Sequence, residues 1–112
     1  MRAEELKGHL DAMLLAALEG GPQHGYAVIE ALRQSTGGRL DLPTGTIYPA
    51  LRRLEQAGLT AGSWSVVGGR RRREYRLTAA GRRALSGRRA DWQEFSAMVS
   101  AALEGRPCPS PA

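Results

Sequence analysis

The stretch that decides the fold is "LPTGTIYPALRRLEQAGLTAGSW", residues 42–64. Its apolar side chains recur at helical spacing, while the other side of the same helix is polar and carries two arginines and a tyrosine. The spacing predicts a helix over about residues 44–57 that ends at Gly58. Its buried side is expected to consist of Ile47, Ala50, Leu51 and Leu54.

Pro49 lies within this helix, where a proline would ordinarily interrupt the hydrogen bonding. In the first turn a proline costs no bond, because the N–H groups there have no acceptor within the helix. We therefore expect the helix cap to lie between Thr44 and Thr46, with Pro49 in or just past the first turn. The polar start of the helix is then free to face a partner outside the core.

Length and composition indicate one folded domain. The chain has 112 residues, of which 42% are hydrophobic and 24% charged, which is ordinary for a globular protein with a single modest core. No apolar run is long enough to cross a bilayer, and acidic residues stand near the start where a signal peptide is apolar, so the expected location is the cytoplasm. The single cysteine, Cys108, has no partner for an internal disulfide.

The charge balance favours an anionic partner. The formal net charge is +5, and arginine supplies all but one of the sixteen basic residues. The planar arginine fork suits phosphate groups and guanine edges better than lysine does. The alternative is an arginine-rich sequence whose charges are only solvated, and the distribution of the arginines has to decide between the two.

Two amphipathic helices are expected before the opening stretch. The first lies within "GHLDAMLLAALEGG" and ends at the Gly20-Gly21-Pro22 turn, and the second lies within "HGYAVIEALRQSTGG" and stops at Gly37. The side chains expected to face the core are Leu10, Met13, Leu14, Ala17 and Leu18 in the first helix and Tyr26, Val28, Ile29, Ala31 and Leu32 in the second.

After Gly58 the pattern changes to that of a β-hairpin. "LTAGSWSVVGGRRRREYRLT" contains two β-favouring runs around Gly68 and Gly69, and Tyr75 and Leu77 alternate with polar residues. Four arginines, residues 70–73, follow at the tip, where their mutual repulsion predicts a counter-charge from a partner. The alternative is a disordered, solvated loop.

The last helix is expected to begin after Thr78 as its N-cap and to run to about Leu103. It is longer than the preceding domain can cover, so its heptad-like apolar seam predicts a symmetric dimer. A helix that folds back onto its own domain is the alternative. The residues of the seam are Leu85, Trp92, Phe95, Val99 and Ala102.

Together these elements predict a mainly α fold with a small β-hairpin, a winged helix-turn-helix with a long C-terminal dimerisation helix. The expected division is a DNA-binding domain over residues 1–78 with its wing at about 59–78, a dimerisation helix over 79–104, and a disordered tail over 105–112. In such a fold the third helix enters the DNA major groove and the wing contacts phosphates. The expected DNA-binding residues are Thr44, Thr46, Tyr48, Pro49, Arg52, Arg53, Gln56, Arg70, Arg71, Arg72 and Arg73.

The same residues resemble the PadR-like transcriptional regulators in their short form with a single C-terminal helix. The resemblance rests on "LLAALEGGPQHGYAVIEAL" (residues 14–32), "GTIYPALRRLEQAGL" (45–59), "RRREYRLTAAGRRAL" (71–85) and Trp92, in this order and spacing. It implies DNA-binding repression by a homodimer that a small effector commonly relieves. It also implies that the recognition surface begins at Tyr48 and Pro49 and continues along Arg52 and Arg53. Four adjacent arginines in the wing are more than the family pattern requires.

Other residues do not form a catalytic or metal site by their spacing. His24 is expected to cap or pack, because neither His9 nor Cys108 stands at the spacing of a metal site or a nucleophile–base pair. We therefore expect no enzyme activity, no metal and no cofactor. Trp92 is expected to pack in the dimer seam; the resemblance adds the alternative that Trp92 and Phe95 hold a flat, apolar, aromatic effector between subunits.

The sequence thus predicts a homodimeric winged-helix transcription factor, a repressor that binds double-stranded DNA at an inverted repeat and has no membrane partner. The alternative is a winged-helix interaction module whose basic face binds an acidic protein. Groove binding requires the polar side of the third helix and the arginines of the hairpin to lie on one side of the molecule.

Overall fold

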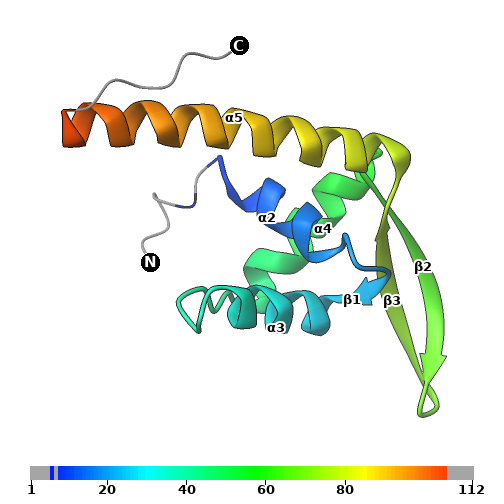
Figure 1. Ribbon diagram of the computed structural model, residues 1–112. Helices are drawn as coiled ribbons and strands as arrows, with labels where there is room; N and C mark the ends of the chain where they lie inside the picture. Colours follow the sequence, from blue (N-terminus) through cyan, green and yellow to red (C-terminus); the bar gives the residue numbers. More distant parts are fainter. Residues whose placement is uncertain (1–5, 7, 106–112) are drawn as a thin grey trace.

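The computed structural model describes residue 6 and residues 8–105, so the predicted tail, including Cys108, lies almost entirely outside the described residues. Residue 105 is described: Gly105 caps the last helix in the left-handed conformation. The elements follow the predicted order of three helices, a hairpin and a long helix, with a short strand added (Figure 1). They are α2 (Leu10–Ala17), β1 (Gln23–His24), α3 (Gly25–Ser35), α4 (Thr44–Gln56), β2 (Thr60–Val67), β3 (Arg70–Leu77) and α5 (Ala79–Glu104).

One apolar core joins the helices to the base of the hairpin. The predicted buried side of α4 is confirmed, and Tyr75 and Leu77 of β3 point inward as expected. Tyr26 was expected in the core, but 66% of it is exposed. The buried side of α3 is centred on Val28 and Leu32, one helical turn apart, so Tyr26 falls on the opposite side. The largest fully buried side chains are Leu14, Leu15, Leu18, Val28, Ile47, Leu51 and Leu54.

Helix α4 begins earlier than the proline rule predicted. Pro43 is the N-cap and Thr44 is already helical, so the expected cap between Thr44 and Thr46 is wrong and Pro49 lies inside the helix. A proline there cannot donate to the carbonyl of Gly45. Gly45 and Pro49 are both exposed, so water can bind that carbonyl and the helix continues.

A two-residue strand, β1, completes a three-stranded antiparallel sheet in the order β1-β3-β2. Residues Gln23 and His24 pair with Tyr75 and Glu74 of β3. No periodicity in two residues could have predicted this strand. The capping role expected for His24 is confirmed, because its Nδ1 accepts a 3.3 Å hydrogen bond from the N–H of Ala27 at the start of α3.

The junction between the hairpin and α5 is tightly packed. The predicted N-cap is confirmed: Oγ1 of Thr78 accepts from the N–H of Gly81 at 3.0 Å and donates to the carbonyl of Gly58 at 2.7 Å. The helix approaches Leu59 so closely that a Cβ at position 81 would lie 1.9 Å from the carbonyl oxygen of Leu59. Glycine is therefore required where α5 leaves the sheet.

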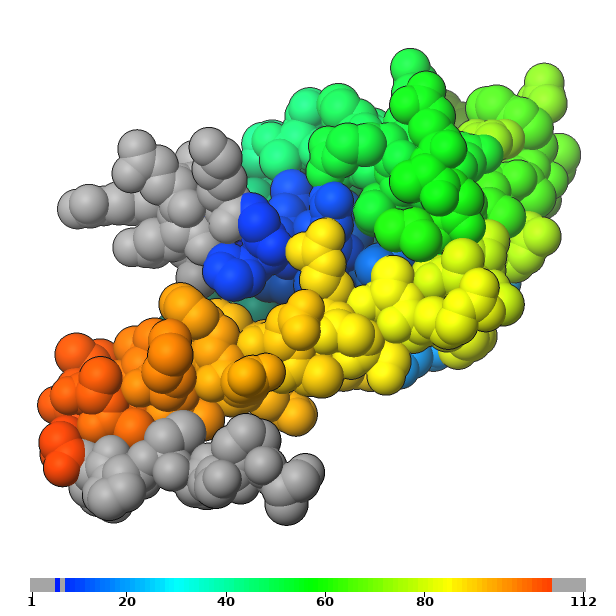
Figure 2. Space-filling view, turned by 90° about the horizontal axis from the view of Figure 1, so that it is seen from above, coloured from blue at the N-terminus to red at the C-terminus, as the bar shows by residue number. Residues whose placement is uncertain are grey.

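Helix α5 is continuous and does not fold back, but its first half packs on α2 of its own chain. Arg89 donates to both carboxylate oxygens of Glu19 at 2.8 and 2.9 Å, and these bonds hold the pKa of Glu19 below its usual value. The second half extends beyond the rest of the domain (Figure 2). Within the described part of the chain, no helix is long and apolar enough to cross a membrane.

The proposed dimer seam requires one correction. Leu85 lies in the first half of α5 and is only 3% exposed, because it belongs to the core of its own chain. The exposed apolar surface begins about two helical turns further along α5, with Trp92 and Phe95. It also includes Met98 and Leu103, which the heptad pattern did not select. Val99 is half-buried and Ala102 exposed along the same helix.

Candidate nucleic-acid interface

The outward side of α4 is a narrow stripe of exposed residues. Gly45, Pro49, Arg52 and Gln56 follow one another at steps of four, three and four, opposite the buried leucines. Arg52 has no carboxylate partner among the described residues. This stripe therefore presents a free guanidinium and a side-chain amide, the two groups that pair most readily with base edges in a major groove.

The start of α4 is polar and exposed. Thr44 and Thr46 both face solvent, and the N-cap Pro43 supplies no side-chain acceptor for the first N–H groups of the helix. Two hydroxyls and a helix start with no capping side chain therefore lie together at one end of the outward stripe.

Tyr48 lies on one flank of the stripe, in contact with α3. A Cβ at position 25 would stand 2.4 Å from Cε1 of the Tyr48 ring, so Gly25 is the residue that lets this ring pack. The ring of Tyr26 meets it edge-on with centroids 6.3 Å apart. Burial raises the pKa of Tyr48 above its usual value. Sequence reasoning placed Tyr48 on an outer surface, whereas it is half-buried and joins the two helices of the turn.

Arg53 lies on the opposite flank of α4. Its guanidinium forms an ion pair with Asp11 of α2, 42 residues earlier in the chain. The side chain of Arg53 is still more than half exposed. Its charge is compensated within the protein, in contrast to that of Arg52.

The arginine run belongs to the second strand of the hairpin. Arg70–Leu77 is strand β3, so all four arginines are held in a sheet and the solvated-loop alternative is wrong. The turn itself is Gly68-Gly69, with positive φ angles of 58° and 77°. Because side chains alternate along a strand, Arg71 and Arg73 lie on one face of the wing, and Arg70 and Arg72 on the other.

The four arginines also differ in their partners. Arg73, far from the tip, donates a 2.5 Å hydrogen bond to Oε2 of Glu55 on α4. The guanidinium of Arg72 lies 3.1 Å from Nε2 of His24, and that of Arg71 lies over the ring of Trp64. Arg70, Arg71 and Arg72 have no carboxylate partner among the described residues.

Trp64 is a residue of this region that sequence reasoning missed. A two-residue turn at Gly68-Gly69 places Trp64 directly opposite Arg73, as the strand register shows. Counting outward from the glycine pair would have found this neighbour, because a hairpin turn determines the register of its strands.

The wing and α4 are positioned together. The hairpin tip and α3 lie on the side of the molecule away from α5, and the N-terminal end of α4 is at the level of α3 (Figure 1). The ion pair between Arg73 and Glu55 links the wing directly to α4. The face of the wing that carries Arg71 and Arg73 therefore lies next to α4.

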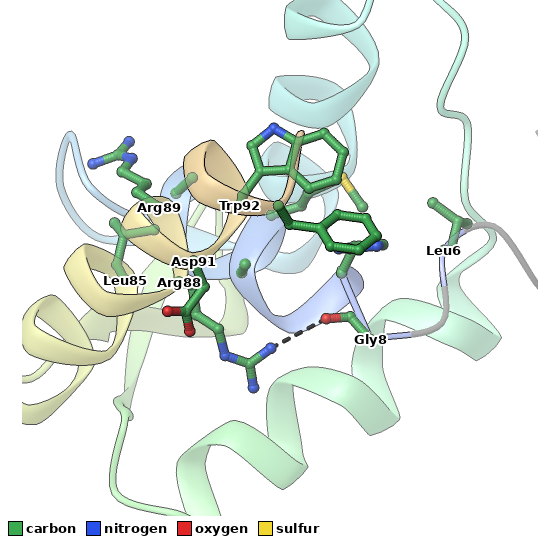
Figure 3. A pocket seen from close by; sticks show the side chains of 12 residues that line it. Leu6, Gly8, Leu85, Arg88, Arg89, Asp91 and Trp92 are labelled. Carbon is green, nitrogen blue, oxygen red and sulfur yellow. Dashed lines mark hydrogen bonds between the residues drawn. The ribbon is translucent and has the colours of Figure 1, made fainter. Parts of the chain in front are cut away.

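A groove of about 820 Å³ lies between α2 and α5, away from these arginines. Its aromatic wall is Trp92, whose ring meets that of His9 edge-on at 5.3 Å and lies 6.3 Å from that of Phe95. Arg88 spans one end of the groove with a 3.1 Å hydrogen bond to the carbonyl of Gly8 (Figure 3). The groove is thus mainly apolar, and its charged lining residues are Arg88, Arg89 and Asp91. Among the described residues, no three His, Cys, Asp or Glu side chains gather closely enough to hold a metal ion.

The arrangement of helix-turn-helix, hairpin and long terminal helix defines a winged-helix regulator. Comparison with known proteins agrees: the pattern of the Transcriptional regulator PadR-like family matches residues 14–87. The chain belongs to this family; PadR-like proteins are DNA-binding transcriptional regulators and not enzymes.

Individual relatives support the same assignment. Transcriptional regulator Rv3488 of Mycobacterium tuberculosis is 49% identical over 55 residues, about half of each chain. A PadR family transcriptional regulator from Eggerthella lenta has a crystal structure with a TM-score of 0.79 and 34% identity, covering 90% of this chain and 87% of that one. A PadR-like regulator from Bacillus cereus has a TM-score of 0.79 and 26% identity, covering 93% of this chain and all of the other.

Proposed function

We propose that this regulator binds double-stranded DNA through the outward stripe of α4 and through the wing. The observation that carries the proposal is a set of cations without a carboxylate partner among the described residues, Arg52 on α4 and Arg70, Arg71 and Arg72 on β3, with the wing attached to α4 by the Arg73–Glu55 ion pair. In this arrangement Arg52 and Gln56 read base edges, while the wing arginines and the hydroxyls of Thr44 and Thr46 bind phosphates. The cytoplasm follows as the proposed site of action, because the partner is DNA.

Three residues of the expected set take different roles in this proposal. Arg53 and Arg73 are neutralised by Asp11 and Glu55, so each holds α4 against a neighbouring element more than it attracts DNA. Tyr48 orients the start of α4 by packing on Gly25. These contacts support a rigid presentation of the stripe, which lowers the entropy lost on binding.

We further propose a homodimer formed through the second half of α5. The support is the exposed apolar surface of Trp92, Phe95 and Met98, since a monomer rarely leaves so many large apolar side chains in water along one helix. A two-fold dimer pairs two α4 helices and matches the symmetry of an inverted repeat. A dimer seated across a promoter excludes polymerase, which is the basis for proposing repression.

The groove between α2 and α5 is the proposed effector site. Its volume suits a drug-sized molecule, and the rings of Trp92 and Phe95 suit a flat hydrophobic one. The groove adjoins the proposed dimer surface, so a bound molecule would change the distance between the two α4 helices. Release of DNA by such an effector is the proposed consequence.

The test is a footprint on the promoter of the protein's own gene, followed by fluorescence anisotropy with the protected duplex and a scrambled duplex. We expect a protected inverted repeat and tighter binding to it than to the scrambled sequence. Equal binding of both duplexes and of an acidic polypeptide, without any footprint, would instead identify a module for acidic proteins.

A further inference from the structure

One face of the wing combines an exposed indole with a stacked guanidinium. The strand register pairs Trp64 with Arg73 and Val66 with Arg71, so all four side chains share this face. Trp64 is 57% and Val66 is 68% exposed, although both are large and apolar. Large apolar side chains that are exposed next to each other indicate a surface that binds a partner.

The two arginines beside Trp64 are not equivalent. Their guanidinium carbons lie 4.6 Å (Arg71) and 5.4 Å (Arg73) from the centre of the ring. Arg73 is neutralised by Glu55 and lodged over Gly62, where a Cβ would stand 2.6 Å from its Nη2. Arg71 has no carboxylate partner among the described residues. Of the two guanidinium groups near the indole, that of Arg73 is therefore paired and that of Arg71 is available to bind an anion.

Stacking on the indole restricts Arg71. A guanidinium over an aromatic face is attracted by the ring, and a side chain that is already held loses less conformational entropy when it binds. This face of the wing also turns toward α4, because Glu55 of α4 reaches Arg73 across the gap. A molecule lying along the outward side of α4 would therefore meet Trp64, Val66 and Arg71.

We infer that Trp64 and Arg71 together form a contact of the wing with the DNA backbone, in which the indole of Trp64 also positions Arg71. Arg71 donates to a phosphate, while the free edge of the indole and Val66 pack on the neighbouring deoxyribose. The deoxyribose–phosphate backbone fits this face because it offers an anion and an apolar edge side by side. The inference rests on the proposed DNA binding. It adds Trp64, which is not among the expected DNA-binding residues, to those that contact the DNA.

A double-mutant cycle tests the dependence of Arg71 on Trp64. Anisotropy is measured on the full chain with a labelled duplex of arbitrary sequence, because a backbone contact requires no operator. We expect Trp64→Leu to weaken binding about three- to tenfold, from the lost stacking and the lost contact. We expect Trp64→Leu to cost much less when Arg71→Ala is already present, since the two residues act as a unit.

The matched control is Arg70→Ala, on the opposite face of the same strand. Its effect should add to that of Trp64→Leu, because Arg70 does not touch the ring. Additive effects of Trp64→Leu and Arg71→Ala, or unchanged affinity in Trp64→Leu, would overturn the inference. If the wild-type protein binds no duplex at all, the proposed function fails instead.

Intrinsic fluorescence gives a second readout, which is measured on the wild-type protein with Trp64→Phe as its control. The chain has two tryptophans, so Trp64→Phe leaves only Trp92, which belongs to α5 and not to the wing. We expect duplex DNA to change the emission of the wild-type protein and to leave that of Trp64→Phe nearly constant. Wild-type emission that does not change at saturating DNA would contradict a contact at Trp64.

Discussion

Arg73 of the wing and Glu55 of α4 form an ion pair with a 2.5 Å hydrogen bond, so the hairpin is attached to the helix beside it. Both side chains are about one-third exposed. This pairing separates Arg73 from the other arginines of the run, which have no such partner. Of the four arginines in the run, Arg73 therefore has a structural role, and the other three are available to bind a partner.

Replacing Arg73 with alanine should destabilise the protein. The change removes a partly buried ion pair, so we expect the free energy of unfolding to fall by about 1 kcal/mol. The measurement is urea denaturation followed by circular dichroism. Arg70→Ala is the control, and it should stay within roughly 0.5 kcal/mol of wild type because its side chain is exposed and unpaired. Equal losses in the two variants would show that the ion pair contributes no measurable free energy of unfolding.

Glycine at position 81 should be indispensable for stability. In Gly81→Ala the new Cβ would collide with the carbonyl oxygen of Leu59, which is backbone and cannot move away. We expect a loss of about 1–3 kcal/mol or more in thermal or urea unfolding. Gly87→Ala, in the same helix with open space around it, should instead stabilise by up to about 1 kcal/mol. A Gly81→Ala protein as stable as Gly87→Ala would rule out the close packing of α5 on Leu59.

Operator recognition should depend on Arg52 and general DNA affinity on the wing. Arg52→Ala should cost about 1–3 kcal/mol on the operator and little on a scrambled duplex, because a base contact is lost. Arg71→Ala with Arg72→Ala should weaken both and lower the salt slope by roughly one unit per lost phosphate contact. Anisotropy over a range of salt concentrations separates the two. An Arg52→Ala loss that is equal on both duplexes would show a phosphate contact instead.

The proposed dimer should dissociate when its exposed aromatic pair is removed. Trp92 and Phe95 are both about half exposed in the single chain, so replacing them with alanine should leave the core intact. We expect light scattering to give a monomer at concentrations where the wild type is a dimer. The control replaces the exposed neighbours Gln93 and Glu94 with alanine and should remain dimeric. An unchanged dimer in the Trp92 and Phe95 variant would place the interface elsewhere.

Stability at alkaline pH should report the packing of Tyr48 on Gly25. Burial raises the folded-state pKa of Tyr48 above the usual value of about 10, which favours the neutral phenol. The folded state therefore holds this proton more tightly than the unfolded state. The resulting stability is fully present below the unfolded pKa and is lost as pH rises through the folded pKa.

The measurement compares wild type and Tyr48→Phe by thermal unfolding from neutral to alkaline pH. Tyr48→Phe keeps the ring but cannot ionise, so its stability should fall less steeply above about pH 10. Parallel curves for the two proteins would mean that the phenol of Tyr48 is as well solvated as in the unfolded chain.

The sequence by itself determined the order of the helices and the hairpin, the buried side of α4 and the N-cap Thr78. Each of these depends on residues a few positions apart: helical spacing, paired glycines at a turn and a threonine before a helix. The family resemblance was also readable from local motifs. The cap of α4 was misjudged even so, because the carbonyl of Gly45, which Pro49 leaves without a donor, is at an exposed site where solvent can reach it.

Only the tertiary structure decided which arginines are free. Arg53 is neutralised by Asp11 and Arg73 by Glu55, partners that stand 42 and 18 residues away in the chain and meet only when the helices and sheet pack. Packing likewise placed Tyr26 outside, Tyr48 against Gly25, and Leu85 in the core of its own chain. Charge and apolar spacing can be counted along a sequence, but pairing and exposure are properties of atoms brought together from distant positions.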